Sequence, residues 1–220
     1  VVDTVIGTGI AWAFAYVLPS WERSQLPALV QRVLKAQAAH VRTSLSVDQL
    51  QAVDNAPELA WRLARREAYD SLSALVLAVD RSLKEPRAVQ PPLQALEQLQ
   101  AHCYQLLGQM SSVKIMLMMR RGQTPSPFAV QQLQAASADI DAHLLTPLAH
   151  ASDADVRLPK PPAPARVLDP KDRDLLPWLM RRLAASRILA RQLQADAAQI
   201  HQALAQQNAA TVPADAAKAA

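Results

Sequence analysis

The feature that most constrains this chain is its first stretch, residues 1–21, with the sequence VVDTVIGTGIAWAFAYVLPSW. From Val1 to Leu18 the one charged residue is Asp3. An apolar run of about 18 residues is the shortest that spans a bilayer as a helix. We therefore interpret residues 1–21 as a transmembrane helix. Because the chain begins with Val and not with Met, we expect it to be a piece of a longer protein.

Small residues in this stretch recur every four positions. Asp3, Gly7, Ala11 and Ala15 fall on one stripe of a helix. Small residues at this spacing let helix backbones approach closely inside a membrane. The stripe also carries the carboxylate, which lipid rejects and a protein interior or a wet cavity accepts. These four residues are our candidates for helix packing or transport, and Asp3 serves either proton coupling or a helix–helix hydrogen bond.

Aromatic residues gather toward the Pro19 end of the stretch, where an interfacial belt lies in membrane proteins: Trp12, Phe14, Tyr16 and Trp21. Two other interpretations remain. The stretch is just long enough to span, so a buried core helix of a soluble domain stays open. A signal peptide fits less well, because Asp3 stands where a basic region is expected.

The segment directly after Trp21 is basic. Residues 22–42 hold four basic residues against one acidic residue, a net charge of +3. Lys and Arg close to the end of a membrane helix favour the cytoplasmic side. We therefore expect the residues after about 21 to lie in the cytoplasm.

The rest of the composition favours helices. Only 4 glycines occur, and the 16 prolines cluster between helix-like segments. The single cysteine, Cys103, excludes an intramolecular disulfide and a cysteine-rich zinc site. The net charge of +4 is too small and too dispersed to indicate nucleic-acid binding.

These patterns predict an all-α chain: one N-terminal transmembrane helix and then an antiparallel cytoplasmic bundle of about five helices. The first bundle helix carries an apolar face that includes His40, and the others span about residues 57–83, 93–121, 126–147 and 173–207. The expected divisions are a last transmembrane helix (1–21), a bundle (22–150), a Pro-rich linker (151–172), a long C-terminal helix packing on the bundle (173–207) and a disordered tail (208–220).

Apolar residues at three–four spacing predict the buried faces. In residues 57–83 these are Leu59, Leu63, Leu72, Leu75, Val76, Val79 and Leu83. In residues 93–121 they are Leu93, Leu96, Leu99, Cys103, Leu106, Met110, Val113 and Leu117. In the last helix they are Leu176, Leu179, Leu183, Ser186, Ala190, Leu193, Ala197, Ile200 and Leu204.

No catalytic motif emerges from the spacing of polar residues, so we expect no enzyme, no cofactor and no metal. Cys103 lies on a buried seam, which predicts an inert thiol. Asp139 and His143 share a helix face, but no third metal ligand is in phase with them. The basic patch Arg62–Arg66 is interpreted as a solvated face with local ion pairs, with binding of lipid headgroups or an anionic substrate as the alternative. The arginines of the second patch, Arg181–Arg191, lie off the apolar seam of the last helix, and their role stays open.

Two stretches resemble the fusaric-acid-resistance (FUSC) family of integral membrane transporters. In residues 1–21 the Asp-Thr-x-x-Gly start, the alanine-rich helix and the Pro-x-Trp exit resemble the last helix of that family's membrane module. The later stretch LARREAYDSLSALVLAVDRSLKEP looks like the cytoplasmic helical region that follows in members of the YccS/YhfK type.

The resemblance implies a proton-driven exporter of aromatic carboxylic acids or similar small toxic compounds in a bacterial inner membrane, working beside a periplasmic adaptor protein. We expect this chain to be its C-terminal segment, with the bundle serving assembly or gating. Its expected partners are the lipid bilayer, the upstream transmembrane helices of the same protein and a second copy of itself. The alternative is a soluble, non-enzymatic interaction module whose first helix belongs to the core.

Overall fold

The computed structural model describes residues 4–9, 21–48, 56–85, 87, 90–120, 126–146 and 175–211 of the 220-residue chain. Five long helices make up most of this part: α2 (Trp21–Leu45), α4 (Ala56–Ser82), α5 (Leu93–Met119), α6 (Pro127–Leu145) and α7 (Leu176–Thr211). No strand occurs among these residues. The all-α bundle is therefore as predicted.

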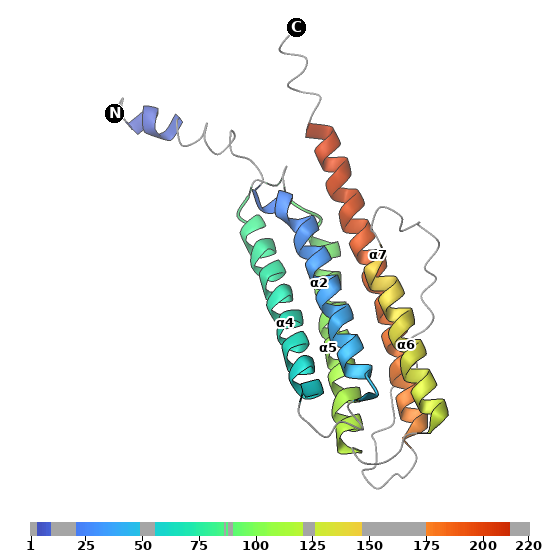
Figure 1. Ribbon diagram of the computed structural model, residues 1–220. Helices are drawn as coiled ribbons and strands as arrows, with labels where there is room; N and C mark the ends of the chain where they lie inside the picture. The colour runs from blue at the N-terminus through green and yellow to red at the C-terminus, as the bar shows by residue number, and fades with distance from the viewer. Residues whose placement is uncertain are drawn as a thin grey trace.

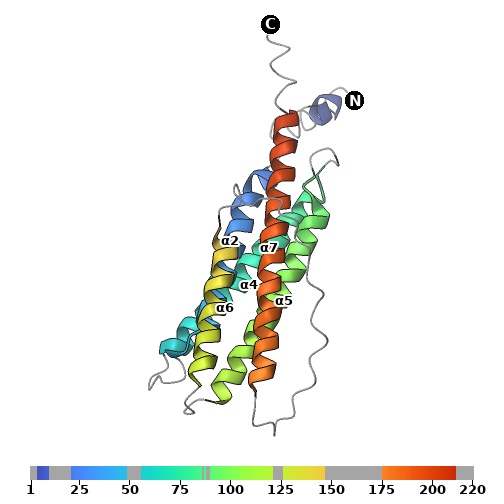
Figure 2. The ribbon, with the colours of Figure 1, turned by 90° about the vertical axis from the view of Figure 1, so that its right-hand side faces the viewer.

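The helices lie side by side in one elongated bundle (Figure 1). A view turned by 90° places α5 and α7 together as a second layer beside α2, α4 and α6 (Figure 2). Contacts between distant residues fix the directions. Ser44 meets Trp61 and Arg32 meets Glu67, so α2 and α4 are antiparallel.

The last helix has two kinds of neighbour. Rising residue numbers on α7 meet falling numbers on α5, from Arg182–Gln109 to Gln207–Gln90, so this pair is antiparallel. On α6, by contrast, His143 meets Gln194, and Asp139 meets Arg187 seven residues earlier on α7. The pair α6 and α7 is therefore parallel, and the expected antiparallel arrangement is wrong for it.

All five long helices contribute to one hydrophobic core. The predicted seams of α5 and α7 are correct: their central members are buried, and only residues at the helix ends, such as Leu93, Leu117 and Leu176, are partly exposed. These seams work because three–four spacing places every apolar side chain on the face that meets the neighbouring helices. The fourth helix begins as predicted, with the Ser126 hydroxyl accepting a hydrogen bond from the Ala129 N–H.

The predicted buried stripe of α4 is wrong at both ends. Leu59, Leu63 and Leu83 are more than half exposed. Trp61 and Ala68 are buried instead. Together with the correctly predicted Leu72, Leu75 and Val79, they form the buried face of α4. The large indole sets the rotation of the first turns, because burying Trp61 turns the neighbouring leucines outward.

The two ends of the chain bear on other predictions. α7 continues to Thr211, so the first residues of the predicted disordered tail are helical. Residues 4–9 form a short helical turn that lies away from the bundle (Figure 1). Val5 is 68 % exposed and Ile6 is 53 % exposed. The Pro-rich linker lies outside the described residues.

The predicted transmembrane helix is only partly within the described residues. No helix among them is both long enough and apolar enough to cross a bilayer. Of the four candidate residues of its stripe, Gly7 is described, and a Cβ added there would meet no atom within 4 Å. Asp3, Ala11 and Ala15 lie outside the described residues, so the stripe itself stays a prediction.

Candidate functional site

Five polar or partly polar side chains are buried inside the bundle, on α2, α4 and α5. Gln37, His40 and Ser44 lie three and four residues apart on one face of α2. Trp61 comes from α4 and Lys114 from α5. Each of the five is at most 9 % exposed. We call these residues the polar layer, and they are the most unusual chemical feature of the described core.

Trp61 is the centre of the polar layer. Its indole Nε1 donates a hydrogen bond of 3.1 Å to the Ser44 hydroxyl. The Lys114 ammonium lies 5.5 Å from the indole ring centroid, and the Arg65 guanidinium lies 5.6 Å from a Trp61 ring centroid. Cations within about 6 Å of an indole are attracted to its electron-rich face. Trp61 therefore links α2, α4 and α5, with the buried Lys114 on one side and the exposed Arg65 on another.

His40 is held in its neutral form. Burial, and to a lesser extent the positive charge of Arg65, lower its pKa from 6.5 to about 4. Its ring centroid lies 6.5 Å from that of Trp61. Neither ring nitrogen of His40 and neither polar atom of the Gln37 side chain has a hydrogen-bond partner among the described residues. Buried polar groups of this kind each cost stability, so they are rare in native cores.

A second polar contact joins α5 and α7. His102 Nδ1 lies 2.6 Å from Asp196 Oδ2, and both side chains are mostly buried. Burial raises the pKa of Asp196, and the neighbouring His102 opposes that rise. The next residue, Cys103, is fully buried, and burial, helped by the charge of Asp196, raises the pKa of its thiol strongly. A thiol of this kind is a poor nucleophile, which agrees with the predicted inert role.

The Asp139–His143 face of α6 contacts α7. His143 Nδ1 lies 2.7 Å from the side-chain oxygen Oε1 of Gln194, and Arg187 Nε lies 3.5 Å from Asp139 Oδ2. No group of three or more potential metal ligands occurs among the described residues. The polar groups of this face therefore hold the parallel pair of helices together.

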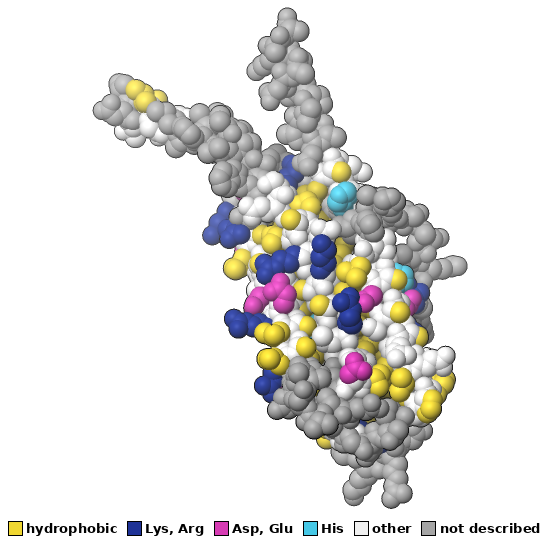
Figure 3. Space-filling view, viewed as in Figure 1, with side chains coloured by type: hydrophobic (Ala, Val, Ile, Leu, Met, Phe, Trp, Pro, Cys, Tyr) yellow, Lys and Arg dark blue, Asp and Glu magenta, His cyan; other side chains and the backbone are white. Residues whose placement is uncertain are grey.

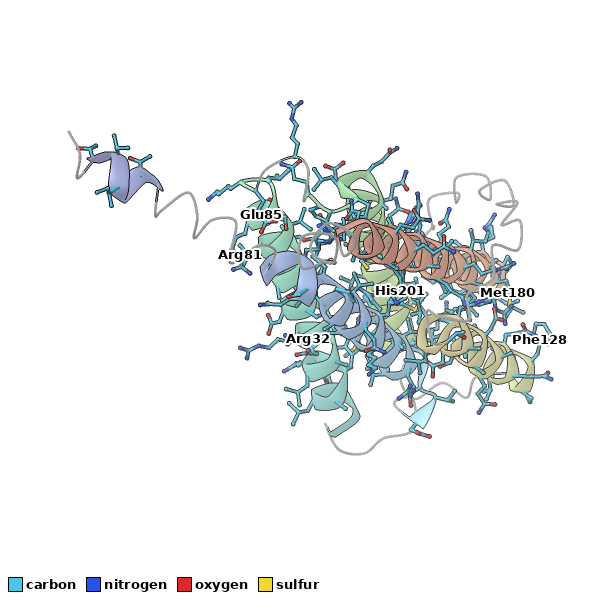
Figure 4. The ribbon with its side chains drawn as sticks, turned by 90° about the horizontal axis from the view of Figure 1, so that it is seen from above. Arg32, Arg81, Glu85, Phe128, Met180 and His201 are labelled. Carbon is cyan, nitrogen blue, oxygen red and sulfur yellow. The ribbon has the colours of Figure 1, made fainter. Side chains whose placement is uncertain are left out.

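The basic patch of α4 is surrounded by acidic partners. Arg62 pairs with Glu58, and Arg66 pairs with Asp70, each one helical turn away. Arg32 of α2 (labelled in Figure 4) donates a 2.9 Å hydrogen bond to Glu67. Figure 3 shows the basic side chains of this face interspersed with acidic and hydrophobic ones. The face has the local ion pairs of the preferred interpretation, and such exposed pairs add little stability.

The second basic patch, on α7, is partly used for packing. Arg182 donates a 2.6 Å hydrogen bond to Gln109 of α5, and its guanidinium lies 5.4 Å from the Trp178 ring. Arg187 reaches Asp139 of α6. These arginines therefore connect α7 to both neighbouring helices.

The polar layer was not predicted from the sequence. A signal for it exists: Gln37 and Ser44 occupy the same helix face as the predicted apolar residues around His40. The contributions of Trp61 and Lys114 come from helices distant in sequence, so only the fold brings them together. Of the sequence-predicted set of Asp3, Gly7, Ala11 and Ala15, the described residues include Gly7 alone, so the set stays a prediction.

Comparison with known proteins gives two partial similarities. The chain is 36 % identical over 87 residues to the inner membrane protein YccS of Escherichia coli (strain K12), which covers 39 % of this chain and 12 % of that protein. It is 30 % identical over 112 residues to a Haemophilus influenzae protein described as uncharacterized, covering 50 % of this chain and 15 % of that one. The chain matches no protein-family model and no solved structure. Part of the chain is therefore similar to a small fraction of an inner membrane protein.

Proposed function

We propose that this chain is the C-terminal part of an inner-membrane efflux transporter of the FUSC type. In this proposal residues 1–21 form the last transmembrane helix, and the helical bundle lies in the cytoplasm and serves assembly or gating. The exported compounds are aromatic carboxylic acids or similar small toxic molecules. The observation that carries the proposal is the similarity to the inner membrane protein YccS, which agrees with the resemblance of residues 1–21 to the family's last membrane helix.

The exposure of the first helical turn supports a membrane role for residues 1–21. Val5 and Ile6 are mostly exposed, although the bundle has a continuous core built from the other helices. A helix belonging to that core would bury these side chains. This observation disfavours the alternative of a soluble interaction module whose first helix is core.

The start of α2 supports the orientation. α2 begins at Trp21, directly after the apolar run, and carries the basic residues Arg23, Arg32, Lys35 and Arg42 against one acidic residue, Glu22. Basic residues at this position favour the cytoplasmic side of a membrane. A helix that continues from a membrane span also gives the bundle a direct mechanical connection to it.

The bundle acts in assembly or gating and performs no chemistry. Its one thiol is buried, and its buried polar groups lie between helices. Transport therefore belongs to the membrane module, where Asp3 is our candidate. We favour a helix–helix hydrogen bond for Asp3 over proton coupling, because the carboxylate lies close to the end of the segment.

The membrane proposal is tested by placing a charge within the apolar run. Ile10→Arg puts an arginine in the middle of the span, where it costs about 2.5–3.5 kcal/mol for insertion. The matched control is Ala28→Arg, the same charge on the exposed surface of α2. We expect the wild-type chain and Ala28→Arg to stay in the membrane fraction after an alkaline carbonate wash, and Ile10→Arg to be released. Equal release of all three proteins would reject the membrane span.

The transport proposal is tested with the full-length protein in bacteria that otherwise lack it. We expect the protein to lower the accumulation of radiolabelled benzoate, and removal of residues 22–220 to abolish this effect. Asp3→Asn distinguishes the two roles of the carboxylate. Unchanged export with an unchanged pH dependence would exclude proton coupling by Asp3.

A further inference from the structure

The outward face of α5 is uncharged along most of its length. It consists of Ala101, Tyr104, Gly108, Ser112, Ile115 and Met119. Tyr104 is 50 % exposed, Ile115 is 54 % exposed and Met119 is 77 % exposed. Between residues 98 and 119 the one Lys, Arg, Asp or Glu of the helix is Lys114, which is buried. We call these six residues the α5 outer face.

Gly108, at the middle of this face, has no explanation within the fold. It lies in the interior of a 27-residue helix, where glycine is destabilising relative to alanine. A Cβ added at Gly108 would meet no atom within 4 Å, so no described part of the chain requires the absence of a side chain. The Ser112 hydroxyl donates a 2.9 Å hydrogen bond to the Gly108 carbonyl oxygen, so this hydroxyl is satisfied within its own helix. Close packing of a helix from another molecule would explain why a glycine occurs at this position.

The α5 outer face is symmetric about Gly108. Ala101 and Ile115 lie seven residues on either side of it, and Tyr104 and Ser112 lie four residues on either side. A second copy of α5 that runs antiparallel and is centred on Gly108 therefore places large side chains against small ones. Isologous contacts of this kind are the usual basis of two-fold dimers.

Charges at the two ends of the face complete the match. Glu97 is exposed near the start of α5, eleven residues before Gly108, and Arg120 follows the end of the helix, twelve residues after it. In the antiparallel arrangement Glu97 of one copy is opposite Met119 of the other and next to Arg120, and symmetry makes this contact occur twice. A parallel arrangement would instead bring like charges together at each end.

We propose that a second copy of this chain binds the α5 outer face, with the two α5 helices antiparallel and crossing at Gly108. The face follows heptad-like steps of three and four residues, which suit helices that pack at a small crossing angle. The absent side chains of the two glycines allow the backbones to approach closely. The proposal does not depend on the transport function.

The exposed leucines of α4 do not support a dimer contact in the same way. Leu59, Leu63 and Leu77 also point outward, but Arg66 and Asp70 lie between them on that face. These charges form an exposed local pair, which a partner helix would have to desolvate. The α4 face also lacks a glycine and a symmetric arrangement.

The proposal is tested by cysteine cross-linking of the whole chain. Gly108→Cys fits the fold because space is open at this position, and the native Cys103 is buried, so the wild-type chain provides a low background. With a short bismaleimide, we expect a covalent dimer for Gly108→Cys. The matched control is Ala142→Cys, which introduces an exposed thiol on α6, and we expect no dimer from it.

A second pair of variants tests the antiparallel register. In the proposed dimer the two copies of residue 101 lie about 21 Å apart along the helix axis, because each is seven residues from the centre. Ala101→Cys alone should therefore give no dimer, whereas a mixture of differently tagged Ala101→Cys and Ile115→Cys chains should give a mixed dimer. Self-cross-linking of Ala101→Cys as efficient as that of Gly108→Cys would overturn the register.

Gly108→Leu provides a measurement that does not rely on cross-linking. We expect it to raise the dimer dissociation constant, measured by analytical ultracentrifugation, by about tenfold or more, because two added side chains meet at the crossing point. Far-ultraviolet circular dichroism checks that the bundle remains folded. The proposal fails if Gly108→Leu dimerises as tightly as the wild type, if Ala142→Cys cross-links as readily as Gly108→Cys, or if Gly108→Cys captures other cell proteins and never its own copy.

Discussion

Replacing His40 by leucine is the most direct test of the polar layer. The side chain is fully buried, and neither ring nitrogen has a hydrogen-bond partner among the described residues. Leucine has a similar volume and cannot be protonated. At neutral pH we expect His40→Leu to be as stable as the wild type or more stable, because replacing an unpartnered buried polar group by an apolar one removes a desolvation penalty.

The larger effect appears as the pH falls. The pKa of His40 is lowered from 6.5 to about 4 in the folded chain, so the unfolded chain takes up the proton first. Protonation between these two values therefore favours unfolding, and stability rises with pH across this window. The difference in pKa corresponds to a loss of about 2–3 kcal/mol in the free energy of unfolding of the wild type between about pH 7.5 and about pH 4.5, and the variant does not show this loss. The positive charge of Arg65, whose guanidinium lies near the Trp61 ring, also opposes protonation of His40.

The assay is urea unfolding of the purified chain at several pH values, followed by circular dichroism. The wild-type and His40→Leu free energies of unfolding should diverge steadily below about pH 6.5. The matched control is His201→Leu, which removes a partly exposed histidine of α7 (labelled in Figure 4) and leaves His40 in place. We expect the free energy of unfolding of His201→Leu to change with pH as that of the wild type does, and therefore to diverge from that of His40→Leu. Parallel pH profiles for wild type and His40→Leu would refute the reasoning.

Three further predictions concern the core. Trp61→Phe removes the N–H that donates to Ser44 and should lower the free energy of unfolding in urea by about 1–2 kcal/mol. Asp196→Leu should lower the free energy of unfolding more than the double variant Asp196→Leu/His102→Phe does, because the single change leaves the mostly buried His102 without its partner. A larger loss of stability in the double variant would contradict this. Cys103 should react with Ellman's reagent only when the chain unfolds, and rapid reaction in native buffer would contradict its burial.

The seams of α5 and α7 could be predicted because helical periodicity is a local property. The spacing from Leu96 to Val113 and from Leu179 to Leu204 is visible in the sequence, and burial follows it. On α4 the same method failed, because Leu59 and Leu63 lie on the outward face of its first turns, whereas the buried face carries Trp61. The choice between those faces depends on α2, whose Ser44 receives the Trp61 N–H.

The polar layer could not be predicted because both the burial of its side chains and the contacts between them depend on the tertiary structure. Gln37, His40 and Lys114 belong to residue types that are usually exposed or half-buried. They become buried only because three helices meet around Trp61. The His102–Asp196 contact has the same origin, since these residues are 94 positions apart in the chain.

The polar layer also bears on how the helices choose their register. An Ala- and Leu-rich helix such as α4 could slide along α2 by one turn and still bury apolar surface. Such a slide would separate the Trp61 N–H from the Ser44 hydroxyl and move the indole away from the Lys114 ammonium, leaving a buried charge without its aromatic neighbour. Buried polar groups that lower stability while excluding alternative registers have precedent in helical bundles. In this chain, the unpartnered Gln37 and His40 lower the stability, and the polar layer to which they belong favours one alignment of α2, α4 and α5.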